Sequence, residues 1–85
     1  MTEFSFQKVG TTYVSKLPIT QGVVQIHFKG DATVSVSANF PNMPPSVVRT
    51  MHNPYSNSIL FELKMPEGVE VKLSTQSEVL KALYL

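Results

Sequence analysis

Residues 59–73 read ILFELKMPEGVEVKL, and this stretch indicates the fold class of the whole chain. Apolar and charged side chains alternate on both sides of Pro66-Glu67-Gly68, with the period of two that is typical of β-strands. Pro66 favours the first position of a turn, and Gly68 can adopt the positive φ that such a turn needs. The pattern therefore predicts a β-hairpin closed by a three-residue loop.

The register of this hairpin places apolar partners on one face and oppositely charged partners on the other, which favours it over a shifted register. The apolar pairs are Met65 with Val69, Leu63 with Val71, and Phe61 with Leu73. The charged pairs are Lys64 with Glu70, and Glu62 with Lys72. We expect the apolar pairs to face the core.

A second hairpin is predicted between residues 22–28 and 32–40, across Lys29-Gly30-Asp31. A three-residue loop sets the apolar residues of the two runs opposite one another, and burial is expected to decide the register. The segment 40–45 contains three prolines that cannot donate to a ladder. We therefore expect it to cross between two sheets.

The same alternation, interrupted by turn residues, extends along the chain and predicts seven or eight strands. Their ranges are 3–9, 12–17, 22–29, 32–40, 46–52, 58–65, 69–74 and 79–84. The last range also fits helical spacing, but its apolar run is short and everything before it is β, so a strand is favoured. We expect one domain, residues 1–85, that folds as a small antiparallel β-sandwich, immunoglobulin-like or related. Residues 1–9 form either an edge strand or an arm.

The composition favours a protein that associates with other proteins over one that binds charged polymers. Charged residues make up 15% of the chain, well below the usual quarter, so Ser, Thr, Asn and Gln must carry much of the polar surface. A lightly charged exterior gives weak protection against association. The net charge is +1 and the basic residues are spread singly, so no nucleic-acid partner is expected. The absence of cysteine excludes disulfides.

The N-terminal segment, residues 1–7, lacks the basic and long apolar regions of a signal peptide. No stretch approaches the roughly 18 apolar residues that a membrane-spanning helix needs. We therefore expect no membrane partner, and a chain that is made as a soluble cytoplasmic product.

Candidate chemical sites are sparse. His27 and His52 are the only histidines and no thiolate accompanies them, which leaves too few ligands for a zinc site. His27 and Asp31 lie near one predicted hairpin end, but no strained nucleophile turn completes a Ser, His and Asp arrangement. Glu62 and Glu70 share a face of the first hairpin, where their lysine partners indicate a solvated charge ladder. We predict no enzyme activity, no catalytic residue, no metal site and no cofactor.

Several apolar positions suit contacts with other protein chains. Residues 79–85 are apolar on both faces and cannot be fully buried in a lone small sandwich unless their strand is central. Met43 lies among prolines as a stiff apolar tip, and Tyr55 lies in a polar loop. The predicted contact residues are Met43, Tyr55, Tyr84 and Leu85.

The chain combines a start without a leader, strands rich in outward Ser and Thr, turns at Gly10-Thr11 and Pro66-Glu67-Gly68, and no Cys or Trp. In this overall style it resembles the small all-β virion proteins of tailed bacteriophages, such as head decoration, head-fibre and tail accessory proteins. The resemblance covers the whole chain but contains no specific motif, so no functional residue is carried over. It implies a structural component of a virion, with capsid or tail proteins as partners.

The sequence therefore predicts a non-enzymatic structural protein that packs, with its own copies or with capsid or tail proteins, into a larger oligomeric assembly. Its location is the virion if the resemblance holds, and the cytoplasm otherwise. The alternative is a ligand-binding β-sandwich module, for carbohydrate or for adhesion, that uses the polar region of His27, Asn39, Asn53, Tyr55 and Asn57. The absence of Trp and the inward parity of most aromatic residues count against a sugar-binding platform.

Overall fold

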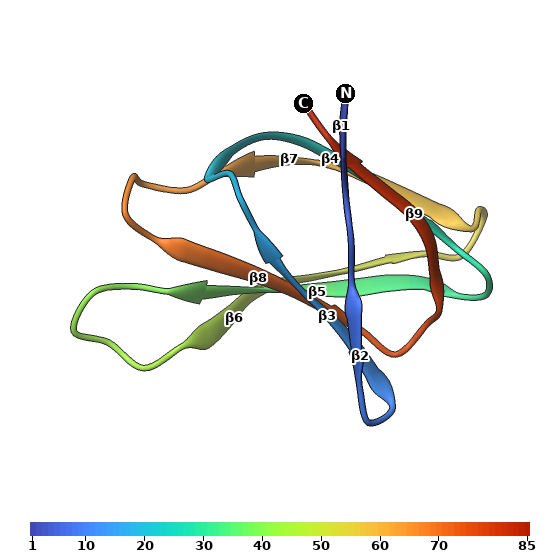
Figure 1. Cartoon of the computed structure of the whole chain (residues 1–85), viewed down its shortest axis with the longest axis horizontal. Helices are drawn as coiled ribbons and strands as arrows, with labels where there is room; N and C mark the ends of the chain where they lie inside the picture. The colour runs from blue at the N-terminus through green and yellow to red at the C-terminus, as the bar shows by residue number, and fades with distance from the viewer.

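Two antiparallel sheets face each other, with no helix and 65% of the residues in strands (Figure 1). The computed structural model describes residues 1–85. Its strands are β1 (Thr2–Phe4), β2 (Gln7–Val9), β3 (Thr12–Leu17), β4 (Gln21–Phe28), β5 (Ala32–Asn39), β6 (Ser46–Asn53), β7 (Ser58–Lys64), β8 (Glu70–Thr75) and β9 (Val79–Tyr84). The four-stranded sheet has the order β1-β9-β4-β7, and the five-stranded sheet has the order β2-β3-β8-β5-β6. The predicted all-β sandwich is confirmed, and the final segment is a strand.

The predicted strand 3–9 is divided into two short strands that belong to different sheets. β1 pairs with β9 and β2 pairs with β3, so this segment forms edge strands of the molecule's own sheets. Between β1 and β2 the chain crosses from one sheet to the other, and the Ser15 hydroxyl donates to the Ser5 carbonyl oxygen at this step (2.8 Å). The rings of Phe4 and Phe6, with centroids 5.7 Å apart, pack against the core beside it.

Both predicted hairpins are wrong, although the predicted burial is correct. β7 lies beside β4 in the four-stranded sheet, whereas β8 lies between β3 and β5 in the five-stranded sheet. β4 and β5 likewise belong to different sheets. Phe61, Leu63, Val71 and Leu73 are all buried, but they approach the core from opposite layers.

The reason is that an inward apolar face can be covered in two ways. Every second residue of a strand is buried whether its apolar partners come from the next strand in the same sheet or from the facing sheet. Alternation therefore shows which face of a strand is buried, but it does not show which strand lies beside it. A turn does form here, since the Val69 N–H donates to the Pro66 carbonyl oxygen (3.4 Å), and Gly68 has the predicted positive φ (84°), but the turn does not close a hairpin. This turn leads from one sheet to the other.

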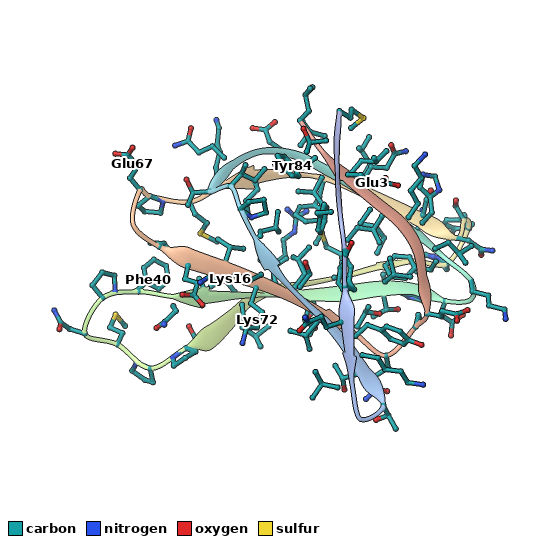
Figure 2. All side chains as sticks on the ribbon, in the orientation of Figure 1. Glu3, Lys16, Phe40, Glu67, Lys72 and Tyr84 are labelled. Atoms are coloured by element: carbon teal, nitrogen blue, oxygen red, sulfur yellow. The ribbon has the colours of Figure 1, made fainter.

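The outward charges also pair differently from the predicted ladder. Glu62 contacts Lys64 of its own strand (3.7 Å between Oε1 and Nζ), and Glu70 contacts Lys16 of β3 (3.4 Å between Oε2 and Nζ). Lys72 lies opposite Lys16 in the register of β3 and β8, and Figure 2 shows the two lysines close together. Glu70 therefore offsets a repulsion between like charges.

The expected crossover at residues 40–45 is wrong as well. This loop joins β5 to β6 within one sheet and projects beyond the rest of the sandwich (Figure 1). Its prolines lie past the ends of both strands, where no ladder hydrogen bond is lost, so they are compatible with a hairpin. The chain instead changes sheets between β6 and β7, at residues 54–57.

The core is small and is built from both sheets. One cluster holds 13 buried residues, and 17 of the 85 residues are buried in all. The two buried polar side chains are hydrogen-bonded: Ser15 donates to Ser5, and Thr75 Oγ1 accepts from the Ser77 N–H (3.0 Å). The largest fully buried side chains are Phe28, Ile26, Leu73, Val24, Val34, Val36 and Val71. In a core of this size each of these side chains contributes a sizeable share of the stability.

Candidate interaction surfaces

The four predicted contact residues lie in three separate places. Met43 (61% exposed) lies in the β5–β6 loop, and Tyr55 (95% exposed) lies in the β6–β7 loop. Leu85, which follows β9, is also exposed. Tyr84 points inward and is half-buried, with its ring centroid 5.9 Å from that of Phe4 (Figure 2). The structure does not bring these residues together into one surface.

An apolar patch lies on the outer face of the four-stranded sheet, and we define it as Val23, Leu60, Leu83 and Leu85. Leu60 and Leu83 flank Gln25 from the two neighbouring strands, β7 and β9. Val23 and Leu85 form the adjacent row and exchange two backbone hydrogen bonds, of 3.1 and 2.9 Å. The four side chains are therefore contiguous around Gln25, on a face where antiparallel sheets normally carry polar residues.

The outer face of the five-stranded sheet has the opposite character. The outward residues of its three central strands are Thr12, Val14, Lys16, Thr33, Ser35, Ser37, Asn39, Glu70, Lys72 and Ser74. All except Val14 are polar or charged, so this face follows the usual alternation of a sheet that is solvated on one side. The apolar patch is thus a property of one sheet and does not reflect the general composition of the chain.

Charged side chains of both signs surround the apolar patch. Glu3 lies on β1 opposite the patch residue Leu83, and Lys81 lies on β9 one row away. Glu62 and Lys64 form an exposed ion pair on β7. An apolar centre with a mixed polar rim is the arrangement typical of protein–protein interfaces.

The β6 edge is a second surface without a partner, and we define it as the unpaired side of Ser46–Asn53. β6 is hydrogen-bonded to β5 on one side only. Six of its eight residues are exposed, including Val47 (63%) and Val48 (41%). Main-chain N–H and C=O groups along such an edge are a template for another strand.

The five residues of the predicted ligand region do not form one site. Asn53, Tyr55 and Asn57 share the turn between β6 and β7, and His27 lies on the neighbouring end of β4. Asn39 lies at the opposite end of the β5–β6 ribbon. The Asn53 side chain is occupied internally, since it donates to a backbone carbonyl of β7 (2.9 Å) and accepts from the Tyr55 N–H (3.0 Å).

The candidate catalytic pairs are also separated. Glu62 faces outward from the four-stranded sheet and Glu70 faces outward from the five-stranded sheet, so their carboxylates lie on opposite sides of the sandwich. Asp31 lines a hollow of Ser and Thr side chains on the five-stranded sheet, whereas His27 belongs to the four-stranded sheet. No three His, Asp or Glu side chains are grouped so that they could hold a metal ion. In this all-strand structure there is no membrane-spanning helix.

No protein-family model, curated protein or solved structure matches this chain. The apolar patch and the β6 edge are the two surfaces of the molecule that suit contact with other chains. Both expose groups that are normally covered in a folded protein.

Three residues of the apolar patch, Val23, Leu60 and Leu83, are absent from the predicted contact residues. The sequence nevertheless contains a signal for Val23 and Leu60. Each belongs to a run of consecutive apolar residues, Val23-Val24 and Ile59-Leu60-Phe61, which strict alternation does not explain. Because the core takes every second residue, Val23 and Leu60 are left on the outer face. Breaks in alternation thus mark residues that are left on an outer face.

Proposed function

We propose that this chain is a non-enzymatic structural protein that packs, through the apolar patch and the β6 edge, into a larger assembly of its own copies or of other protein chains. The apolar patch is the observation that supports this most strongly. Leu60 is 66% exposed and Leu85 is 72% exposed, both on the outer face of a sheet. Covering such side chains removes apolar surface from water, which is favourable by about 25 cal/mol per Å².

The total surface area supports the same proposal. The chain exposes 5418 Å², whereas a compact monomer of 9.4 kDa exposes about 5,000 Å². The projecting loop at residues 40–45 and the exposed strand β6 contribute to this excess. Association would remove the surplus from water and stabilise a domain whose own core is small.

We further propose a virion as the setting of this assembly, on the basis of the resemblance in overall style to small all-β phage proteins. Capsid or tail proteins are then the partners, together with copies of the chain. Such assemblies repeat one contact many times, so a surface of modest area on each copy is sufficient to hold it in place.

Leu83→Lys is expected to weaken association. Leu83 is half-buried at the centre of the outward row, so a lysine there can reach solvent while placing a charge where an apolar contact is needed. We expect an association constant at least about tenfold lower, because the residues that contribute about 2 kcal/mol or more to an interface cluster near its centre, and about 1.4 kcal/mol corresponds to a factor of ten. Light scattering over a concentration series up to about 1 mM measures this change.

Ser74→Lys is the matched control, because it adds the same charge to the outer face of the other sheet. We expect the molar mass of this variant to equal that of the wild-type chain at every concentration in the series. A wild-type chain that remains monomeric throughout the series, or a Leu83→Lys variant that associates as the wild type does, would contradict the proposal.

A further inference from the structure

The β6 edge is the least protected of the four sheet edges. β1 and β2 are only three residues long, and β7 carries Glu62 and Lys64 among its outward side chains. Short edge strands and edge charges both discourage pairing with another chain. β6 is eight residues long, contains no proline or glycine, and has Arg49 as its single charged residue. It is therefore the edge best suited to accept a further strand.

We propose that the β6 edge pairs antiparallel with the β6 edge of a second copy, about a two-fold axis at Met51, so that the two five-stranded sheets become continuous. This inference rests on the proposed function and deepens it, because it names the partner of one surface as another copy of the chain. A two-fold contact uses the same residues from both copies, so the strand must be complementary to itself.

The regular part of β6 sets the length of this pairing. Arg49–Asn53 pairs with β5 without a register shift, whereas Val48 is the extra residue of a bulge. With a two-fold axis perpendicular to the sheet, directly opposed residues of the two strands point their side chains to the same face. Neighbouring residues in a strand point to opposite faces, so the axis must lie between the two copies of one residue. Centred on Met51, the pairing uses the regular part of both copies and stops before the bulge.

Charge selects the same centre. A centre at Arg49 would oppose two guanidinium groups, which is unfavourable for directly opposed residues. A centre at Met51 instead opposes Arg49 with Asn53, and Thr50 with His52. Each cation therefore faces a neutral amide across the axis.

Neighbouring centres conflict with the backbone. A centre at Thr50 carries the ladder into the bulge at Val48, where the strand bends away from regular pairing. A centre at His52 places Pro54, which has no N–H, opposite Thr50. Met51 is the centre that avoids both conflicts.

The Met51 centre also brings exposed apolar groups together. Exposed apolar side chains flank both ends of the paired segment, because Val47 (63% exposed) precedes it and Tyr55 (95% exposed) follows it in each copy. Met51 packs against the core, and its exposed part faces the Met51 of the second copy. The pairing thus covers apolar surface as well as satisfying main-chain groups.

Single cysteines report this pairing directly, because the chain contains none of its own. Met51→Cys places two thiols opposite each other at the axis, with Cα atoms about 4.5–5.5 Å apart, a separation that suits a disulfide. We expect mild oxidation to link this variant into a dimer on a non-reducing gel at least about tenfold faster than Ser74→Cys. Ser74 lies on the outer face of the same sheet, away from the edge. The rate at which Ser74→Cys forms linked dimers therefore measures disulfide formation by random collision.

Arg49→Cys tests the register. Two copies of this variant hold their cysteines about 14 Å apart along the strands, so the variant is not expected to link to itself. An equal mixture of Arg49→Cys and Asn53→Cys is expected to form the mixed dimer. The pairing is overturned if Met51→Cys forms disulfide-linked dimers no faster than Ser74→Cys does. It is also overturned if Arg49→Cys links to itself as fast as Met51→Cys does.

Hydrogen exchange of the wild-type chain gives a second readout that needs no substitution. Pairing protects the amides of Arg49–Asn53 that point away from β5, so we expect their exchange to slow at least about tenfold between dilute and roughly 1 mM protein. Unchanged exchange overturns the pairing. If association persists and remains sensitive to Leu83→Lys, the proposed function stands and this inference fails, whereas a chain that never associates overturns both.

Discussion

Phe28→Ala is expected to lower the free energy of unfolding by about 3–5 kcal/mol, which is a large fraction of the stability of a chain of this size. Phe28 is the largest of the fully buried side chains, with 1% of its surface exposed. It ends β4, and its N–H donates to the Asn57 carbonyl oxygen in the turn before β7 (2.7 Å). A core cluster of 13 residues has few groups that can move into the space left by the ring, so the cavity persists.

Urea unfolding followed by far-UV circular dichroism, at low protein concentration, measures this loss. Leu80→Ala is the control, because it removes an aliphatic side chain that is 64% exposed on β9. We expect it to change the free energy of unfolding by less than about 0.5 kcal/mol. Equal unfolding midpoints for Phe28→Ala and the wild type would show that the two layers do not pack around this ring.

Most strand boundaries could be predicted from the sequence because side-chain alternation and turn residues are local properties, and the exception is the range 3–9, which holds two strands. The predicted strand 32–40 is β5, Ala32–Asn39, and the predicted strand 79–84 is β9. The neighbour of each strand could not be predicted in the same way. The pairing of β4 with β7 and of β3 with β8 joins segments far apart in the chain, and no local pattern specifies it.

The two mistaken hairpins show why short connections were misleading. Residues 29–31 and 66–68 are each short enough to close a hairpin. The Lys29 N–H, however, donates to the Glu78 carbonyl oxygen (2.9 Å), and the Met65 N–H donates to the Thr20 carbonyl oxygen (2.8 Å). The backbone at both connections is thus hydrogen-bonded to a distant segment instead of to the strand that follows. These bonds form only when the whole sandwich is assembled.

The candidate interaction surfaces could likewise be predicted only in part from the sequence. The two-sided apolar character of residues 79–85 is visible in the sequence, and it places Leu83 and Leu85 on one face and Tyr84 on the other. The sequence does not indicate that β4 lies beside β9, or that β7 lies beside β4. Those neighbours place Val23 and Leu60 next to the outward leucines and so complete the apolar patch. The patch depends on sheet order and therefore on long-range pairing.

Gly22→Ala is expected to lower the free energy of unfolding by at least about 2 kcal/mol. Gly22 has a φ of 144°, a conformation that residues with a Cβ atom rarely adopt. A methyl group there would clash with the Leu85 carbonyl oxygen and would lie 3.1 Å from Ile19 Cδ1. The clash with Leu85 involves backbone, so either β4 shifts or the end of the chain moves away. Both outcomes strain the two hydrogen bonds between Val23 and Leu85.

This substitution links stability to the apolar patch, because it displaces Leu85 without altering any patch side chain. We therefore expect Gly22→Ala also to speed hydrogen exchange at the Leu85 amide and to weaken association measured by light scattering. Gly30→Ala is the matched control, since Gly30 has no positive φ and no atom lies within 4 Å of an added Cβ. It should leave stability within about 0.5 kcal/mol of the wild type and association unchanged. If Gly22→Ala has the same free energy of unfolding and the same hydrogen exchange at the Leu85 amide as the wild type, the chain end does not lie beside β4. The apolar patch would then lack Leu85.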